Sequence, residues 1–241
     1  METPADTTGA SIETLLTGQP APSRRLMAIR RAVSYRRHVL DACLEWAVPL
    51  MAGDVIDLGG TPAARARGAF RPPPARSWCS VNSNPAVQPD VVADVSTVPL
   101  PDGSADCVLC REVLEHLPAP RACLREAWRL LRPGGVLIAS VPFLYPVHPD
   151  PEDFQRWTAR GLIELLNGWT DVRIWAMGRG WGAVGLLLEL QGRSLEQPWR
   201  RLAWEGGRLL QWLDVQQPMT SAEDRAPRFT TGYFVIASKP R

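Results

Sequence analysis

The residues best suited to chemistry follow short apolar runs, and the first such place is the stretch VIDLGGTPAAR, residues 55–65. Asp57 lies within its apolar run, and Gly59 and Gly60 come directly after it. A backbone can pass close to a ligand where side chains are absent, so this stretch begins like a nucleotide-binding loop. The next three residues, TPA, break the glycine pattern. A working cofactor loop, a variant of one and a relic all remain open.

Polar side chains follow four further apolar runs in the same way. They are Asn82, Ser83 and Asn84 after the second run, Asp94 after the third, Arg111, Glu112, Glu115 and His116 after the fourth, and Tyr145 and His148, behind Phe143, after the fifth. In a parallel sheet, ligands bind beyond the carboxyl ends of the strands. If the runs are neighbouring strands, these groups collect at one edge and form a cleft suited to a polar cofactor.

The elements that must position these groups are strands alternating with helices. We expect strands at 54–58, 77–81, 90–93, 106–110, 136–141, 171–176 and 229–238, and helices at 63–70, 120–131 and 158–166. The strands are short, apolar and rich in β-branched residues, and the helices carry start and stop signals such as Pro120, Thr158 and the RPGG turn. Such alternation predicts an α/β fold with a mostly parallel sheet covered on both faces.

Three segments lie outside this alternation. Residues 1–22 are rich in Thr, Ala, Pro and Gly and predict a disordered tail, ahead of a single domain over 23–241. Residues 24–48 predict an amphipathic helix whose arginines form a solvated basic face or an anion or partner site. Residues 177–228 predict two helices, about 181–191 and 198–214, with four of the ten tryptophans. This insertion would form a layer over one sheet edge, a substrate lid or a dimer face.

The bulk composition fits one soluble globular domain. The chain has 241 residues, 45% of them hydrophobic, and a net charge of +2, so charge does not argue for nucleic acid. No run is long enough to span a membrane. The five cysteines include a C-x-x-C pair at 107 and 110, but no second ligand pair, so we expect buried thiols and no metal. The odd number of cysteines favours the reducing cytoplasm.

Longer stretches of the chain resemble one known family. They are VIDLGG, then VVADVSTVPLPDGSADCVLCREVLEHLPAPRACLREAWRLLRPGGVLIASVPF, then HPDPEDFQRWTARGL, and finally GYFVIASKP. In this order they resemble the class I S-adenosylmethionine-dependent methyltransferases, in particular the methyltransferase type 11-like branch with its LP.D.S.D, LEH and PGG block. The resemblance runs from about residue 54 to residue 166. It implies a Rossmann-like, doubly wound, seven-stranded sheet with an antiparallel last strand, interrupted before that strand by the helical insertion.

The resemblance also implies a cofactor, S-adenosylmethionine, and places residues around it. Asp57, Gly59 and Gly60 match the loop under its methionine and ribose. Asn82 stands where the family usually has an acid that binds both ribose hydroxyls. An amide accepts one bond and donates another, without the strength of a charge-assisted pair.

Further along the chain, the resemblance places Asp94 at the amino group of the adenine and Val95 near its ring. Arg111 and Glu112 match positions at the methionine end and the donor methyl.

Candidate catalytic residues lie on the side where the family's acceptors enter. Imidazole is suited to take up a proton near neutral pH, so His148 would deprotonate a hydroxyl or amine acceptor, with Asp153 orienting it and Tyr145 beside it. His116 is a further candidate, although the LEH element more often holds its loop in place. Equally, His148, Asp153 and Arg156 would form a hydrogen-bonded clasp that fixes the loop, and the two roles are compatible.

Three functional hypotheses follow. The first is methyl transfer to oxygen or nitrogen of a small molecule, such as a natural product or a sugar derivative, by a monomer or homodimer without nucleic-acid or membrane partners. The second is a protein of this fold without methyl transfer activity, a binding partner or a catalyst of another reaction. It rests on the missing glycines and on Asn82. The third is nucleic-acid modification through the basic helix, which has little other support.

Overall fold

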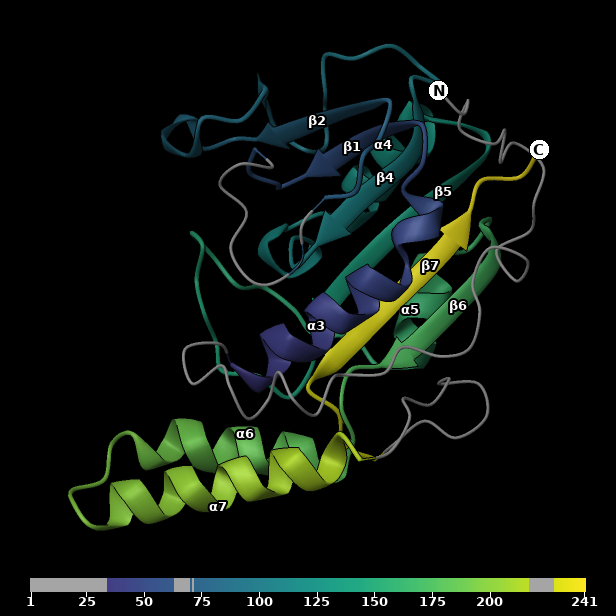
Figure 1. Ribbon diagram of the computed structural model, residues 1–241. Helices are drawn as coiled ribbons and strands as arrows, with labels where there is room; N and C mark the ends of the chain where they lie inside the picture. The colour runs from purple at the N-terminus through teal and green to yellow at the C-terminus, as the bar shows by residue number, and fades with distance from the viewer. Residues whose placement is uncertain (1–33, 63–69, 71, 217–227) are drawn as a thin grey trace.

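The computed structural model describes residues 34–62, 70, 72–216 and 228–241. In this part of the chain, seven strands form one sheet in the order β3-β2-β1-β4-β5-β7-β6 (Figure 1). The strands are β1 Asp54–Leu58, β2 Ser77–Asn82, β3 Val91–Val92, β4 Ala105–Arg111, β5 Leu131–Pro142, β6 Thr170–Ala176 and β7 Gly232–Ser238. Only β7 runs antiparallel to its neighbours, β5 and β6. The predicted doubly wound sheet with an antiparallel last strand is therefore confirmed.

Helices cover both faces of this sheet. They are α3 Tyr35–Trp46, α4 Pro120–Leu130, α5 Ala159–Leu165, α6 Gly180–Gly192 and α7 Trp199–Asp214, with short 3-10 helices η1 Val48–Leu50, η3 Pro85–Val87 and η4 Leu114–His116. Figure 1 shows α3 on one face and α4 and α5 on the other. The predicted caps are present, because the Thr158 side chain accepts from the Gly161 amide and Pro120 opens α4. The helix expected at 63–70 lies almost wholly outside the described residues.

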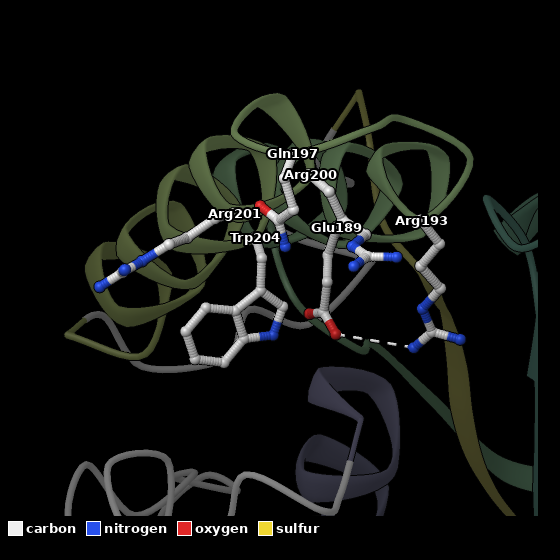
Figure 2. A pocket seen from close by; sticks show the side chains of 6 residues that line it. All are labelled: Glu189, Arg193, Gln197, Arg200, Arg201 and Trp204. Atoms are coloured by element: carbon white, nitrogen blue, oxygen red, sulfur yellow. Dashed lines mark ion pairs between the residues drawn. The ribbon is translucent and has the colours of Figure 1, made fainter.

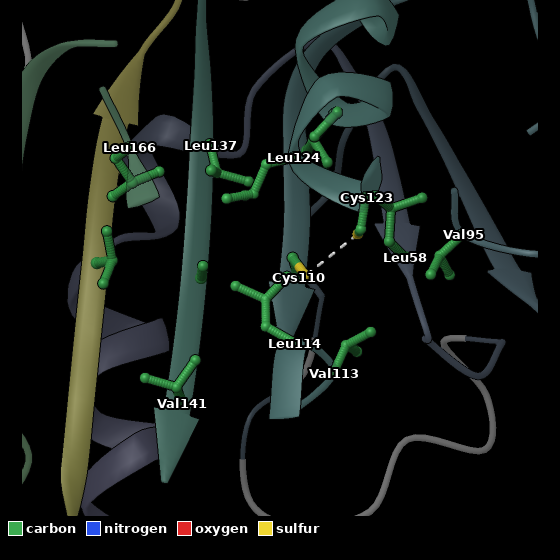
Figure 3. Close-up of a cluster of buried hydrophobic side chains, with 14 of the residues drawn as sticks. Leu58, Val95, Cys110, Val113, Leu114, Cys123, Leu124, Leu137, Val141 and Leu166 are labelled. Atoms are coloured by element: carbon green, nitrogen blue, oxygen red, sulfur yellow. Dashed lines mark hydrogen bonds between the residues drawn. The ribbon is translucent and has the colours of Figure 1, made fainter. Parts of the chain in front are cut away.

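The core forms two apolar layers, one on each face of the sheet. Side chains of a strand alternate between faces, so Val108 and Cys110 of β4 join the layer under α4 and α5, while Cys107 and Leu109 join the layer under α3. Figure 3 shows the first layer, in which the Cys110 sulfur lies 4.0 Å from that of Cys123. The C-x-x-C pair therefore points to opposite faces, and none of the five cysteines forms a disulfide.

Strand β5 begins earlier than the sequence predicts. It starts at Leu131, directly after α4, and takes in the RPGG residues that we expected to form a turn. Gly134 has a φ of +79°, and the register against β4 shifts near Ala105. The backbone of this irregular stretch is satisfied by the chain that follows β7, since the Gly134 amide donates to the Lys239 carbonyl at 2.9 Å. The turn is thus built into an irregular strand start.

The insertion is a helical hairpin of α6 and α7 that projects beyond the sheet (Figure 1). Glycines allow the two helices to touch, because a Cβ on Gly207 would lie 2.6 Å from the Gly185 carbonyl oxygen. At its base, Asp214 accepts hydrogen bonds from the Arg179 and Gly182 amides at the start of α6 and from the hydroxyl of buried Tyr35 on α3. Among the described residues, no helix is long and apolar enough to cross a bilayer.

Candidate functional site

The carboxyl ends of β1, β2, β4 and β5 bring most of the predicted site residues to one edge of the sheet. Leu58 at the end of β1 pairs with Val81 of β2 and Cys110 of β4, and Arg111 of β4 pairs with Ser140 of β5. The loops that leave these strands therefore start side by side. They carry two groups of polar residues, one after β1 and β2 and one after β4 and β5.

The first group is the glycine loop after β1. Gly59 has a φ of +73°, and a Cβ there would overlap the side chain of Val113. A Cβ on Gly60 would overlap the carboxyl group of Asp57. Both positions therefore need glycine, one for its backbone angle and both for space. The two glycines that the sequence retains therefore allow the loop to pack closely against Val113 and Asp57.

Asn82 braces this loop from the end of β2. Its amide nitrogen donates to the carbonyl oxygens of Gly59 at 3.0 Å and Gly60 at 3.2 Å, and its amide oxygen accepts from the Asn84 amide at 2.9 Å. A carboxylate could not donate these two bonds. The departure from the family's usual acid thus fits the altered glycine loop beside it.

Asp57 forms a buried ion pair with Arg111 of β4. The Arg111 guanidinium lies 2.5 Å from Asp57 Oδ2. Burial raises the pKa of Asp57, and the positive charge of Arg111 opposes this shift. Among the described residues, Asp57 Oδ1 and Arg111 Nε are buried without a hydrogen-bond partner. Polar atoms left in this state are costly, so they suit contact with a polar ligand.

Asp94 and Val95 follow β3 as predicted. Asp94 is exposed, and its Oδ1 accepts from the Ser96 amide at 2.7 Å. Val95 is buried in the layer under α4. The exposed carboxylate and the apolar side chain beside it suit the amino group and the ring of an adenine, the roles that the family resemblance implies.

Glu112 connects the two groups, and here α3 contributes a residue that the sequence did not single out. Glu112 has a φ of +54°, and its carboxylate accepts from the Ser140 hydroxyl at 2.6 Å and from the Arg36 guanidinium. Arg36 is buried, donates to the Thr231 carbonyl at 3.2 Å and lies 5.3 Å from the ring centre of Tyr145. Of the two interpretations given for the arginines of this helix, a solvated face does not apply to Arg36, which is buried.

The second group contains Glu115, His116 and His148. Glu115 is fully buried, and its Oε1 lies 3.7 Å from His116 Nε2 and 3.9 Å from His148 Nε2. Burial, and the negative charge of Glu112 nearby, raise the pKa of Glu115 to about 8. The two imidazole rings meet edge to face with centres 5.0 Å apart. Sequence spacing alone did not indicate that these three side chains converge.

The predicted clasp is formed around His148. Its backbone amide donates to Asp153 Oδ2 at 3.0 Å, and Arg156 donates to the same oxygen at 2.7 Å. Hydrogen bonds from Arg156 lower the pKa of Asp153. The Tyr145 ring lies 5.1 Å from the His148 ring, and 35% of the His148 side chain is exposed. The geometry thus allows His148 to meet a substrate while the clasp holds its loop.

Two cavities of the described chain lie away from this edge. One of about 310 Å³ is on the hairpin, lined by Glu189, Arg193, Gln197, Arg200, Arg201 and Trp204 (Figure 2). Another of about 550 Å³ lies beside α4 and α5, between Arg121, Trp128 and Trp169. Neither is lined by a predicted site residue. Residues 63–69, which follow the glycine loop in the sequence, lie outside the described residues.

Known proteins share the segment that carries this site. Residues 56–139 match a family described as "Methyltransferase domain". A ubiquinone biosynthesis O-methyltransferase of Xanthomonas axonopodis is 35% identical over 108 residues, which are 42% of this chain and 43% of that protein. A probable S-adenosylmethionine-dependent methyltransferase of Mycolicibacterium smegmatis is 43% identical over 80 residues, 31% of each chain. This chain therefore spans less than half the length of these relatives.

The fold is also similar to that of solved methyltransferase structures. A SAM-dependent methyltransferase from Archaeoglobus fulgidus superimposes with a TM-score of 0.51 and 17% identity, over 84% of this chain and 94% of that one. Strand order, glycine loop and matched segment together define a class I methyltransferase fold. The resemblance to class I S-adenosylmethionine-dependent methyltransferases predicted from the sequence is therefore confirmed over residues 56–139, and the fold agrees with it.

Proposed function

We propose that this protein transfers the methyl group of S-adenosylmethionine to an oxygen or nitrogen atom of a small molecule, such as a natural product or a sugar derivative. The observation that carries the proposal is the family match over residues 56–139. That segment spans the glycine loop, Asp94 and the polar loop after β4. The named O-methyltransferase among the relatives supports an oxygen acceptor.

The residues after β1, β2 and β3 suit the cofactor of this family. Gly59 and Gly60 hold the loop against Val113 and Asp57, and Asp57 Oδ1 is a buried acceptor without a partner among the described residues. Asp94 offers an exposed carboxylate for the adenine amino group. In this proposal, Asn82 acts mainly by holding the glycine loop, and less by binding the ribose.

The chemistry asks little of the protein beyond positioning. S-adenosylmethionine, when bound, supplies a methyl group already activated by its sulfonium. The residues of this chain must orient the acceptor in line and exclude water. A hydroxyl or amine acceptor must also lose a proton, and the partly exposed imidazole of His148, oriented by Asp153, suits that role. Tyr145 and His116 line the same loop region.

The second candidate is a protein of this fold that does not transfer methyl groups. Two observations favour it. Position 82 holds an asparagine where the family usually has an acid, and Arg111 already pairs with one carboxylate oxygen of Asp57. Loss of ribose hydrogen bonds worth a few kcal/mol would weaken cofactor binding by orders of magnitude. The two candidates therefore differ in measured cofactor affinity.

Calorimetric titration with S-adenosylmethionine and S-adenosylhomocysteine tests the proposal. We expect sub-millimolar dissociation constants that rise about tenfold or more in Asp94→Ala, because one charged hydrogen bond is removed. Asp102→Ala, which removes an exposed acid elsewhere, serves as the matched control and should bind as the wild type does. Absence of binding at millimolar ligand would refute methyl transfer and favour the second candidate.

Turnover should depend on His148 more than cofactor affinity does. Once an acceptor is found by screening, His148→Ala should lower kcat by about 10²–10⁴-fold, the usual range for a general base. Its dissociation constant for S-adenosylmethionine should change little. Turnover equal to that of the wild type would remove His148 from catalysis and leave it the role of clasp.

We further propose that the protein acts in the cytoplasm as a homodimer that pairs through the α6–α7 hairpin. Five cysteines without a disulfide suit a reducing compartment. The hairpin carries exposed Trp181, Leu187, Leu188, Trp199, Leu202, Leu209, Trp212 and Leu213. Apolar side chains grouped on one projecting element are typical of an interface.

A further inference from the structure

The side chains of Glu115, His116 and His148 converge where the loops after β4 and β5 meet. His116 Nδ1 lies 2.6 Å from the Glu152 carbonyl oxygen, and His148 Nδ1 lies 3.1 Å from the Pro146 carbonyl oxygen. A carbonyl can only accept, so each neutral imidazole carries its proton on Nδ1. Both Nε2 atoms then point bare lone pairs toward Glu115, at 3.7 and 3.9 Å.

Glu115 has no hydrogen-bond partner for its side chain in this arrangement of the described residues. Its side chain is fully buried, and neither carboxylate oxygen has a hydrogen-bond partner among the described residues. Glu112, which adds negative charge nearby, is already engaged by Arg36 and Ser140. A buried carboxylate beside two imidazole nitrogens is neutralised either by a proton or by a cation bound among the three groups, because no hydrogen bond within the described chain compensates its desolvation.

We propose that Glu115, His116 and His148 bind a divalent transition-metal ion such as Mn²⁺, Fe²⁺, Co²⁺ or Zn²⁺. One ligand atom from each residue lies within 4.8 Å of the other two. Two imidazoles and one carboxylate, with further positions open, are a common donor set for these ions. Metal–ligand bonds of about 2.0–2.2 Å require the three groups to move slightly closer together. This departs from our expectation from sequence that the protein holds no metal.

Neighbouring groups already hold the two imidazole rings in the way that is usual for histidine metal ligands. Histidine ligands almost always donate their other ring N–H to a carbonyl or a carboxylate, which fixes tautomer and orientation. His116 does so with Glu152, and His148 with Pro146, while Asp153 Oδ2 lies 3.3 Å from His148 Nδ1. The clasp of Asp153 and Arg156 thus gains a function, because it aims His148 Nε2 at Glu115.

The site would bind the acceptor of the reaction proposed above, and its role in turnover rests on that function. Three protein ligands leave open positions, which oxygen atoms of an acceptor would fill. A metal ion at this place also lowers the pKa of a bound hydroxyl, so the acceptor would lose its proton to solvent without a protein base. The Nε2 of His148 would then hold the ion in place of taking the proton.

Titration of the EDTA-dialysed protein with CoCl₂, followed by visible absorbance, tests the site without cofactor or acceptor. We expect one Co²⁺ per chain, with affinity reduced about 100-fold or more in Glu115→Gln, His116→Ala and His148→Ala. Glu164→Gln, which alters an exposed carboxylate on α5, is the matched control and should bind as the wild type does. Equal binding by the wild type and His148→Ala, or no saturable binding by the wild type, would overturn the proposal.

Thermal unfolding gives a second readout that does not depend on colour or activity. Mn²⁺ at about 100 times its dissociation constant should raise the Tm of the wild type by on the order of 5–10 °C. It should leave the Tm of Glu115→Gln unchanged. In EDTA, Glu115→Gln should be at least as stable as the wild type, because the replacement breaks no hydrogen bond of the described chain and a neutral amide costs less to bury than a carboxylate. If Glu115→Gln is less stable than the wild type in EDTA, the claim that the buried Glu115 side chain lacks a stabilising partner is wrong.

Titration with S-adenosylmethionine in EDTA separates this proposal from the proposed function. Cobalt binding without cofactor binding would retain the metal site and refute methyl transfer. Cofactor binding without cobalt binding would retain the proposed methyl transfer and refute the metal site.

Discussion

Two aspartates of β1, three positions apart, have opposite pKa shifts. Asp57 lies at the carboxyl end, where burial raises its pKa. Asp54 lies at the amino end, where hydrogen bonds from Arg76, Ser77 and Arg132 lower its pKa against a modest effect of burial. One strand therefore holds an acid under unfavourable burial at the candidate site and a stabilising acid at the opposite edge. The acid at the amino end of the strand therefore contributes to stability, whereas the acid at the carboxyl end lies in the candidate site.

Replacement of Asp54 should change how stability depends on pH. Its pKa is lower in the folded than in the unfolded state, so its contribution is fully present above about pH 5 and is lost as the pH falls. The side chain is 21% exposed and its partner Arg76 is 64% exposed, so screening limits the effect to on the order of 1 kcal/mol. Urea unfolding should show Asp54→Asn less stable at pH 7 and equal to the wild type near pH 2. Asp171→Asn, an exposed position on β6, should retain the wild-type pH dependence, and a constant difference for Asp54→Asn would contradict the prediction.

The sequence indicated which residues lie at the site but not how they pair. Asp57, Gly59 and Asp94 became candidates because Asp57 lies within an apolar run, and Gly59 and Asp94 directly after one, at motif positions. Arg36 was missed because it pairs with Glu112, 76 positions away, and no local pattern records such a contact. The convergence of Glu115 and His148 was missed for the same reason, since it depends on how the loops after β4 and β5 fold toward each other.

At the scale of elements, the sequence predicted most of the fold. The bounds of β1 match the prediction, and β2, β4 and β6 begin and end within one residue of it, because their β-branched and apolar runs are flanked by turn residues. Local signals failed at the start of β5, where the glycines expected to form a turn before the strand belong to the strand. The Gly134 amide there donates to the Lys239 carbonyl, just after β7. Local signals also could not show that α6 and α7 pack against each other through glycines, since that contact is tertiary.

Adjacent glycines of α7 should respond oppositely to the same substitution. A Cβ added to Gly207 would lie 2.6 Å from the Gly185 carbonyl oxygen, so Gly207→Ala would force the helices apart and destabilise the protein by about 1–3 kcal/mol. At Gly206 the nearest atom to an added Cβ is Leu188 Cδ2, at 3.4 Å, so Gly206→Ala should stabilise by up to about 1 kcal/mol through helix propensity. Thermal unfolding of the two variants checks the difference. Equal Tm values would show that the hairpin does not pack through Gly207.

The whole molecule places its candidate site and its hairpin at the same edge of the sheet. Strand β5 ends at this edge beside the start of β7, and the chain reaches β7 from the hairpin. Asp214 ties the start of α6 to α3, the helix that also supplies Arg36 to Glu112. Two hairpins paired through these helices would therefore lie next to the site. The exposed apolar side chains of α6 and α7 support the proposed dimer face.

Charge placed on the exposed face of α7 should disrupt the proposed dimer. Leu209 and Trp212 are exposed three positions apart, on one side of the helix. Burying a glutamate at an apolar interface is strongly unfavourable, so Leu209→Glu with Trp212→Glu should convert the dimer into a monomer in sedimentation velocity at tens of micromolar protein. Ile163→Glu on α5 is also an exposed apolar position but lies away from the hairpin, so it should leave the dimer intact. Because α6 and α7 pack through glycines on their facing sides, the double variant should keep its Tm, and the loss of the dimer would then reflect the interface alone. A wild-type protein that sediments as a monomer at every concentration would refute the dimer and return the hairpin to the role of a lid.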